Sequence, residues 1–379
     1  MGGIERILAN YLSILQNEEE LYIDVLIDYD TENNVFHHFI PSNVNISYLF
    51  DKHYYLMREN LFSKRNTNWI NKFNYKILNF KEKRKKKRVL MEHILDGKYD
   101  MVINFSNHFD PYINFDKLEC PIIRWQHSAI DEIREKDLRI LNRYNKIVTI
   151  CEDMKQQLIN YVPSDKLEVL FNPMETQKVL SLANEKLPSQ YDFDYFVQVA
   201  RLDKIKRHSD LIIIFNQLVR KGIKEKLLII GNGPELQNLK MLINELGLQE
   251  RCFLLGEIEN PYPYIKNAKL FLHTSEREGL PTVLLESMIL NTPVIAMDCP
   301  TGPREVLDDG KCGELIEIGN QEKFVSKTLD LLESPQKMDI YKRNMKVHIK
   351  KFSEVEIKKQ FISLIKGMTN LLSETVDKD

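Results

Sequence analysis

Two glutamates, Glu278 and Glu286, flank a predicted helix start in the stretch TSEREGLPTVLLES. Gly279 permits a tight turn and Pro281 suits the first helical position, so a helix is predicted over PTVLLESMILNT, before Pro293. Free backbone N–H groups at a helix start can bind a phosphate, and carboxylates accept hydrogen bonds from vicinal sugar hydroxyls. We therefore expect the two carboxylates to contact different parts of one ligand lying across the helix end. The alternative is that both are solvated charges favoured by the helix dipole.

The surrounding sequence alternates short apolar runs with longer amphipathic segments, which is typical of parallel sheets covered by helices. The first series of strand-like runs is LYIDVLI, MVINF, PIIRWQ and KIVTI, and the second is YFVQVA, KLLIIG, CFLLG, LFLHT and PVIAM. A linker is expected near Asn172 to Asp194, and GNGP at Gly231 to Pro234 is interpreted as a strand-to-helix turn. The domains are predicted to span 1–175 and 190–345, with C-terminal helices over 346–379. Ligands of such sheets bind in a cleft at the strand ends.

Composition excludes several other classes of protein. The chain has 379 residues, enough for two domains, and a formal net charge of -2, which gives no indication of nucleic-acid binding. Its five cysteines are scattered without a C-x-x-C pair, which indicates reduced thiols rather than disulfides or a zinc site. No run approaches the roughly 18 apolar residues of a membrane span. The segment MGGIERIL lacks a signal-peptide pattern.

The segment EGLPTVLLE resembles the E-x7-E motif of retaining glycosyltransferases of the family 4 type, the glycosyl transferases group 1, many of which build bacterial polysaccharides. Further segments resemble the same family in the same order: GGIERIL, WQHS, FNP, VARLDKIKRHSDLI, IIGNGPELQNL, LFLHTSEREGLP and CPTGPREVLDDGKCGELI. The resemblance implies a GT-B fold, in which two Rossmann-like domains face each other across a cleft. It also implies that the first domain binds the acceptor and the second the nucleotide sugar.

The resemblance implies a role for each residue at the helix start. Glu286 would hold the ribose of the nucleotide, and Glu278 would face hydroxyls of the transferred sugar. The N–H groups of Gly279 and Leu280, ahead of Pro281, would meet phosphate or sugar oxygens of the donor.

Two cations complete the implied donor site. Arg201 and Lys206 would neutralise the diphosphate that leaves, because fixed charges stabilise the negative charge that develops as the glycosidic bond breaks. No metal and no cofactor would then be needed. Two D-x-D strings, Asp28 to Asp30 and Asp192 to Asp194, are of the kind that binds divalent ions in other glycosyltransferases. We interpret them as polar residues of a strand end and a linker.

The N-terminal half carries two further candidates and one departure from the family. His127 follows a predicted buried strand, where it would face donor or acceptor; the alternative is a hydrogen-bonded structural histidine. Gly3 matches the glycine pair near the start of the family's sequences, and the resemblance implies that it contacts the donor. In the family an apolar strand precedes that pair, whereas here the pair directly follows Met1. We therefore expect the first sheet to lack its first strand.

A basic run, NFKEKRKKKR, includes Lys81 to Arg88 and follows a segment rich in aromatic residues. It is interpreted as a surface that rests on an anionic membrane leaflet, with a solvated helix face or loop as the alternative. The expected protein is cytoplasmic and peripherally attached to the inner face of the cell membrane.

The sequence thus predicts a metal-independent, retaining hexosyltransferase. The donor would be a nucleotide diphosphate sugar, with TGPREVL favouring a UDP-sugar, and the transferred group a hexose or N-acetylhexosamine. The acceptor would be a lipid-linked or free saccharide in cell-surface polysaccharide synthesis, such as capsule or O-antigen. The alternatives are a sugar-nucleotide epimerase, a phosphorylase, or a degenerate sugar-nucleotide-binding scaffold without activity.

Overall fold

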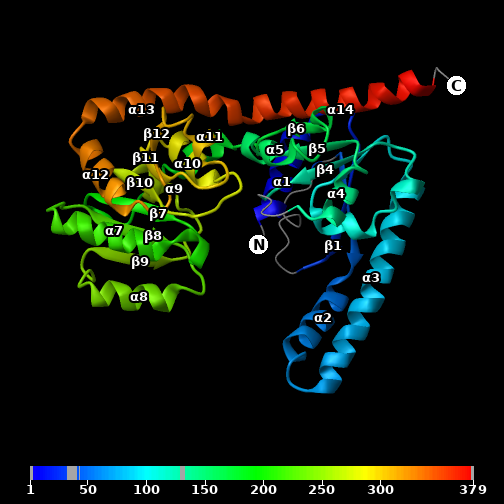
Figure 1. The fold of residues 1–379 in the computed structure, drawn as a ribbon, viewed down its shortest axis with the longest axis horizontal. Helices are drawn as coiled ribbons and strands as arrows, with labels where there is room; N and C mark the ends of the chain where they lie inside the picture. Colours follow the sequence, from blue (N-terminus) through cyan, green and yellow to red (C-terminus); the bar gives the residue numbers. More distant parts are fainter. Residues whose placement is uncertain (1–2, 32–40, 42, 129–132, 377–379) are drawn as a thin grey trace.

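The computed structural model describes residues 3–31, 41, 43–128 and 133–376. Two α/β domains built on parallel sheets lie side by side, and two long C-terminal helices run along both (Figure 1).

The second domain contains a six-stranded parallel sheet in the order β12-β11-β10-β7-β8-β9. Most residues of its strands are apolar and buried, as in parallel sheets covered by helices on both faces. They are β7 (Tyr195–Val199), β8 (Lys226–Ile230), β9 (Cys252–Gly256), β10 (Leu270–His273), β11 (Val294–Met297) and β12 (Gly313–Ile316). The helices are α7 (His208–Arg220), α8 (Leu236–Glu245), α9 (Tyr262–Lys266), α10 (Thr282–Ile289), α11 (Pro303–Val306) and α12 (Gln321–Leu332), and the short 3-10 helix η6 is Lys204–Lys206. Pro281 caps α10 rather than beginning it, so the helix starts one residue later than predicted.

The first domain contains two separate parallel sheets. β1 (Ile23–Tyr29) pairs with β2 (Val44–Phe50), while β3 (Val102–Asn104), β4 (Ile122–Gln126), β5 (Lys146–Thr149) and β6 (Leu167–Val169) form a four-stranded sheet. Among the described residues no strand pairs with both β1 and β3. The helices α1 (Gly3–Leu15), α4 (Glu135–Leu141) and α5 (Glu152–Leu158) belong to this domain, with the 3-10 helices η2 (Asn107–Tyr112), η3 (Phe115–Lys117) and η4 (Ser164–Lys166).

One helix joins the two sheets of the first domain. In α1, Leu12 packs with Val25 and Val44 of the two-stranded sheet. Tyr11 packs edge-on against Trp125 of β4, and its hydroxyl donates to the carbonyl of Phe171 at 2.7 Å. The packing of α1 therefore connects the two sheets.

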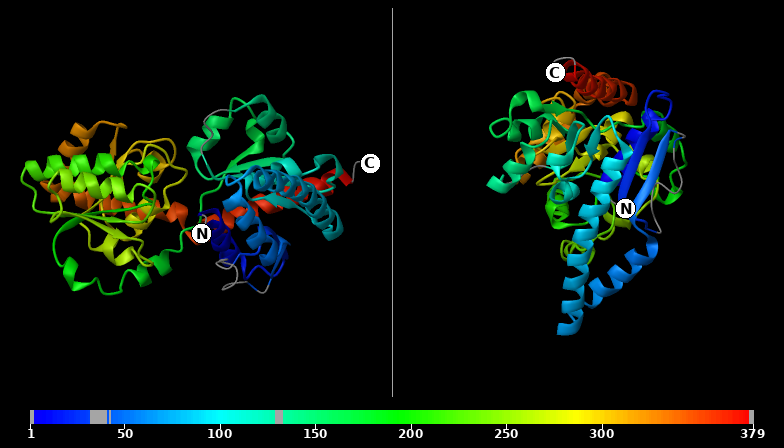
Figure 2. Two further views of the ribbon diagram at one scale, coloured as in Figure 1. Left: turned by 90° about the horizontal axis from the view of Figure 1, so that it is seen from below. Right: turned by 90° about the vertical axis from the view of Figure 1, so that its right-hand side faces the viewer.

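A helical arm, formed by α2 (Lys52–Lys64) and α3 (Trp69–Gly97), projects away from both domains (Figures 1 and 2). It contains the basic run, which is not a uniform surface. Lys86 is only 3% exposed, and its ammonium pairs with Asp28 at 2.7 Å and with Glu82, which is also buried, at 3.3 Å. The expectation that all of Lys81 to Arg88 contacts a membrane is therefore wrong for Lys86, because this lysine anchors the arm to β1.

The connections between the domains are helical. The expected linker from Asn172 to Asp194 contains α6 (Thr176–Leu182) and the 3-10 helix η5 (Ser189–Tyr191). At the C-terminal end, α13 (Pro335–His348) lies on the second domain, η7 (Ile349–Phe352) crosses between the domains, and α14 (Glu354–Val376) lies on the first. No helix among the described residues is long and apolar enough to cross a membrane.

Candidate active site

The candidate site lies at the carboxyl edge of the six-stranded sheet. β7 and β10 are neighbours, so the loops that follow them meet at this edge. The buried hydroxyl of Thr274 donates to the carbonyl of Lys206 at 3.1 Å, and the N–H of Glu276 donates to the carbonyl of Ile205 at 3.0 Å. These bonds hold the segment carrying Lys206 beside the loop carrying Glu278.

Lys206 and Glu278 form a close ion pair. The Lys206 ammonium donates to both Glu278 carboxylate oxygens, at 2.6 and 2.7 Å, and His273 Nε2 lies 3.0 Å from one of them. Burial alone would raise the pKa of Glu278, but the hydrogen bond from His273 and the charge of Lys206 outweigh it and hold the pKa at about 2. Glu278 is therefore a fixed carboxylate across the physiological pH range.

Two buried histidines beside this ion pair were not among the predicted residues. His273 is the last residue of β10, and its Nδ1 has no hydrogen-bond partner within the described chain. His208 opens α7, and burial, together with the charges of Lys206 and His273, lowers its pKa to about 4. His208 is therefore neutral at physiological pH. The strand-end position of His273 in LFLHT was the only sequence signal for either.

The loop from Glu278 to Pro281 presents free backbone donors. In the described residues the backbone N–H groups of Gly279 and Leu280 have no hydrogen-bond partner. The N–H of Thr282, the first residue of α10, also has no intrahelical acceptor. These groups form a potential binding site for an anion at the start of α10.

Glu286 lies on the second turn of α10 and faces the other domain. It is half-buried. Burial raises its pKa to about 7, and the positive charge of Arg6 on α1 lowers the pKa by a smaller amount. The Glu286 charge in turn contributes to the raised pKa of Tyr262 on α9. Gly3 is the first residue of α1, one turn before Arg6. The structure therefore places the start of α1 opposite Glu286, on the other side of the boundary between the domains.

Arg201 follows β7 and is exposed, and its guanidinium has no ion pair or hydrogen bond to any described residue. The adjacent turn GNGP packs against it: the N–H of Leu202 donates to the carbonyl of Asn232 at 3.0 Å. A Cβ at Gly233 would lie 2.3 Å from the Leu202 carbonyl oxygen. The turn thus has the packing role expected of it and supports the backbone beside Arg201.

His127 follows β4 in the first domain. Its Nε2 donates to the carbonyl of Phe105 at 2.8 Å, and burial lowers its pKa to about 4. The ring is therefore neutral, with the N–H on Nε2, and Nδ1 is a buried acceptor without a described partner. The carbonyl oxygen of His127 lies 2.9 Å from where a Cβ would stand on Gly279. His127 therefore borders the loop that carries Glu278.

Aspartates of the two D-x-D strings form hydrogen bonds or ion pairs with other side chains. Asp28 accepts from Lys86 at 2.7 Å and from His108 at 2.5 Å; burial would raise its pKa, but these two hydrogen bonds lower it. Asp194 pairs with Lys269 at 2.7 Å. No group of three or more His, Cys, Asp or Glu side chains in the described part of the chain is arranged to hold a metal ion.

Comparison with known proteins identifies relatives of both domains. Residues 182–348 match the family described as glycosyl transferases group 1. An uncharacterized glycosyltransferase of Methanocaldococcus jannaschii is 33% identical over 203 residues, covering 52% of this chain and 49% of the relative. The chain thus matches about half the length of this relative.

Two similarities extend over nearly the whole chain. The N-acetylgalactosamine-N,N'-diacetylbacillosaminyl-diphospho-undecaprenol 4-alpha-N-acetylgalactosaminyltransferase of Campylobacter jejuni is 27% identical, covering 97% of this chain and 96% of that protein. The crystal structure of HepE from Anabaena in complex with UDP superposes with a TM-score of 0.75 at 18% identity, covering 97% of this chain and 96% of HepE.

Proposed function

Because this chain belongs to the group 1 glycosyl transferases and has the GT-B fold, we propose that it transfers a hexose or N-acetylhexosamine from a UDP-sugar to a saccharide acceptor, with retention of the anomeric configuration. The observation that carries the proposal is the Lys206–Glu278 ion pair, which lies beside unpaired N–H groups at the carboxyl edge of the sheet. Fixed charges and open donors at such an edge suit a ligand that carries both hydroxyls and phosphates.

The charges at this edge support a transfer that needs no metal. Arg201 is free to contact the departing diphosphate. An ammonium has three donors, of which the contacts with Glu278 use two, so Lys206 keeps one for a phosphate oxygen. The N–H groups ahead of α10 add partial positive charge at the same place. Glu278, with a pKa of about 2, remains able to accept hydrogen bonds from sugar hydroxyls.

Different observations support the identity of the donor and the retention of the anomeric configuration. The UDP complex of HepE supports a uridine nucleotide, since the fold is shared over nearly the whole chain. Retention rests on the resemblance of the Glu278–Glu286 segment to retaining enzymes. NMR of the anomeric proton in donor and product tests retention, and inverted product would contradict it.

A panel of nucleotide sugars tests the donor. Ligands that bind the folded state raise the unfolding temperature by mass action, with about 2.7 kcal/mol of stabilisation at a hundredfold excess over Kd. We expect UDP-sugars to stabilise the protein and GDP- or ADP-sugars to do so less. Stabilisation without transfer to any acceptor would instead favour a sugar-nucleotide-binding scaffold. Equal stabilisation by every nucleotide would contradict a uridine-specific site.

We also propose that the acceptor is lipid-linked and that the helical arm holds the protein on a membrane. The Campylobacter relative is named for an undecaprenol-linked substrate, which supports a lipid carrier. The arm exposes large apolar side chains, with Trp69 76%, Phe80 60% and Phe73 57% exposed. These three residues and Ile77 recur every three or four positions, so they share one face of α3.

Basic side chains flank this apolar face. The exposed basic members of the run are Lys81, Lys83, Arg84, Lys85, Lys87 and Arg88. Apolar residues bordered by cations suit the interface of an anionic bilayer, where each basic residue contributes about 1 kcal/mol. The proposed location is therefore the cytoplasmic face of the cell membrane, where nucleotide sugars are available.

A further inference from the structure

We propose that Asp153 and Cys151, in the first domain, position the Glu278 loop of the second domain, so that domain closure itself completes the donor site. This inference rests on the proposed function. It concerns residues that hold the loop without touching a substrate.

The start of α5 and the start of α11 cap each other across the domain boundary. Glu305 of α11 accepts the backbone N–H of Glu152, the first residue of α5, at 2.7 Å. In the opposite direction, Asp153 of α5 accepts the N–H of Gly302, which precedes α11, at 3.2 Å. Unpaired N–H groups at a helix start favour a carboxylate, so each domain supplies the other's cap.

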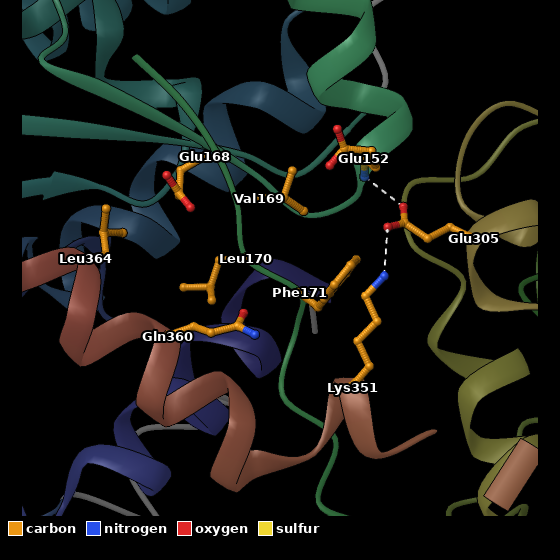
Figure 3. A pocket seen from close by; sticks show the side chains of 9 residues that line it. All are labelled: Glu152, Glu168, Val169, Leu170, Phe171, Glu305, Lys351, Gln360 and Leu364. Carbon is orange, nitrogen blue, oxygen red and sulfur yellow. Dashed lines mark hydrogen bonds and ion pairs between the residues drawn. The ribbon is translucent and has the colours of Figure 1, made fainter. Parts of the chain in front are cut away.

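Glu305 also forms an ion pair with η7, the segment that crosses between the domains. Lys351 of η7 approaches the Glu305 carboxylate at 3.7 Å. Figure 3 shows both interactions at the edge of a cavity of about 370 Å³, where Glu305 from the second domain meets Glu152 of the first domain and Lys351 of η7. The reciprocal caps are therefore tied to the element about which the domains would move.

Thr301 connects this boundary to the donor loop. Its side chain is 1% exposed, and its hydroxyl lies 2.9 Å from the carbonyl oxygen of Gly279 and 3.2 Å from that of Glu278. The Glu278 N–H in turn donates to the carbonyl of Pro300 at 2.9 Å. On its other side, Thr301 lies near the buried thiol of Cys151, where it partly offsets the rise in the pKa of that thiol caused by burial.

Close backbone packing makes this connection rigid. Gly302 has a φ of 93°, and a Cβ there would lie 2.5 Å from the Gly279 carbonyl oxygen. Gly279 itself is pressed against the His127 carbonyl, where a Cβ would lie at 2.9 Å. The Glu278 loop is thus held between the first domain and the segment from Pro300 to Gly302. A shift of α5 relative to α11 would therefore displace the loop that presents Glu278 and the free N–H groups.

The first test is hydrogen exchange of the full chain saturated with UDP, read on peptides covering 276–283. We expect Asp153→Ala to speed exchange there about tenfold, because the loop loses its support from the first domain. Glu152→Ala is the matched control: among the described residues its side chain accepts a hydrogen bond from Gln156 on the same helix and no other, and its backbone N–H remains. Asp153→Asn keeps an acceptor oxygen and should resemble the wild type. Equal exchange in Asp153→Ala and Glu152→Ala would overturn the inference.

The second test separates loop positioning from stability. Thr301→Val should lower kcat for transfer by about ten- to a hundredfold, as expected for a displaced catalytic loop, and should also weaken UDP binding, because the same loop presents the N–H groups proposed to contact the diphosphate. Thr301→Ser keeps the hydroxyl and should restore most of kcat. An unchanged kcat in Thr301→Val, or no rescue by serine, would overturn the inference. Absence of transfer by the wild type would count against the proposed function alone, since the exchange experiment needs no turnover.

Discussion

At the scale of single residues, the two glutamates have different surroundings and should have different roles. Glu278 is paired with Lys206 and His273, whereas Glu286 faces Arg6 across the cleft. We expect Glu286→Ala to weaken UDP binding by about 1.5–3 kcal/mol, the value of hydrogen bonds to a charged group. Glu278→Ala should leave UDP affinity within about twofold but lower kcat by about 10²–10³-fold. Calorimetry and initial rates measure the two quantities, and equal losses in both variants would contradict this division.

The raised pKa of Glu286 predicts a pH-dependent affinity. In the free protein Glu286 titrates at about 7. If its carboxylate accepts hydrogen bonds from the ribose hydroxyls, protein with deprotonated Glu286 binds the nucleotide more tightly than protein with protonated Glu286. Affinity should therefore rise as pH increases through the pKa of Glu286. We expect affinity for UDP-glucose, whose diphosphate does not titrate in this range, to increase up to about tenfold per pH unit below the pKa and then level off. Glu286→Gln should flatten the profile, and a flat wild-type profile would refute the assignment.

Residue types and order were enough to find part of this site. Glu278, Lys206 and Arg201 stand in a recognisable motif order, and the structure brings them to one sheet edge. The ion pair between Lys206 and Glu278 could not be predicted, because their positions are 72 apart and depend on the course of two loops. His208 has no distinguishing pattern, since a buried histidine at a helix start looks like any polar residue there.

At the scale of elements, the strands with long apolar runs were predicted, and three short or more polar strands were not. All nine predicted runs correspond to strands, most of them buried strands of the two larger parallel sheets. Three strands were not predicted: β2 with the sequence VNISYLF, β6 with LEV and β12 with GELI, each of which contains polar residues. The arm was also missed as a projecting element, since its charged composition does not show that Lys86 and Glu82 turn inward.

The arm predicts membrane binding that depends on both charge and apolar contact. Replacing Lys83, Arg84 and Lys87 with Gln, or Trp69 and Phe73 with Ser, should release the protein from vesicles of anionic phospholipid. Each lost basic residue costs about 1 kcal/mol, and salt should weaken wild-type binding. Sedimentation with the vesicles measures this.

A control for that experiment replaces exposed cations outside the arm. Arg343, Lys346 and Lys350 lie on or just after α13, which is remote from the arm in Figure 1. Their replacement with Gln changes the net charge equally and should leave binding unchanged. Equal release by both triple variants would indicate a general charge effect and contradict a membrane-facing arm. Lys86 is left intact in both variants, because its loss would remove an ion-pair partner from the carboxylates of Asp28 and Glu82.

At the scale of the whole molecule, the two domains differ in how their sheets are closed. In β8 all but one residue is buried, and neighbours pair with it on both sides, whereas β1 has one buried residue and a single paired neighbour among the described strands. Local opening follows such differences in burial and pairing. We expect amides of β1 to exchange about a hundredfold faster than those of β8 in the unliganded protein. Equal, high protection of both strands would show that α1 alone closes the first domain.

The central claim is that the Lys206–Glu278 site transfers sugar from a UDP-sugar to a saccharide acceptor. The most direct measurement incubates the protein with UDP-sugars and lipid-linked saccharides, without added metal and with chelator, and follows acceptor mass and released UDP together. We expect one acceptor to gain one hexose or N-acetylhexosamine for each UDP released, and Glu278→Gln to lose this by about 10²–10³-fold. Transfer that requires a divalent metal, or that proceeds equally in Glu278→Gln, would contradict the account.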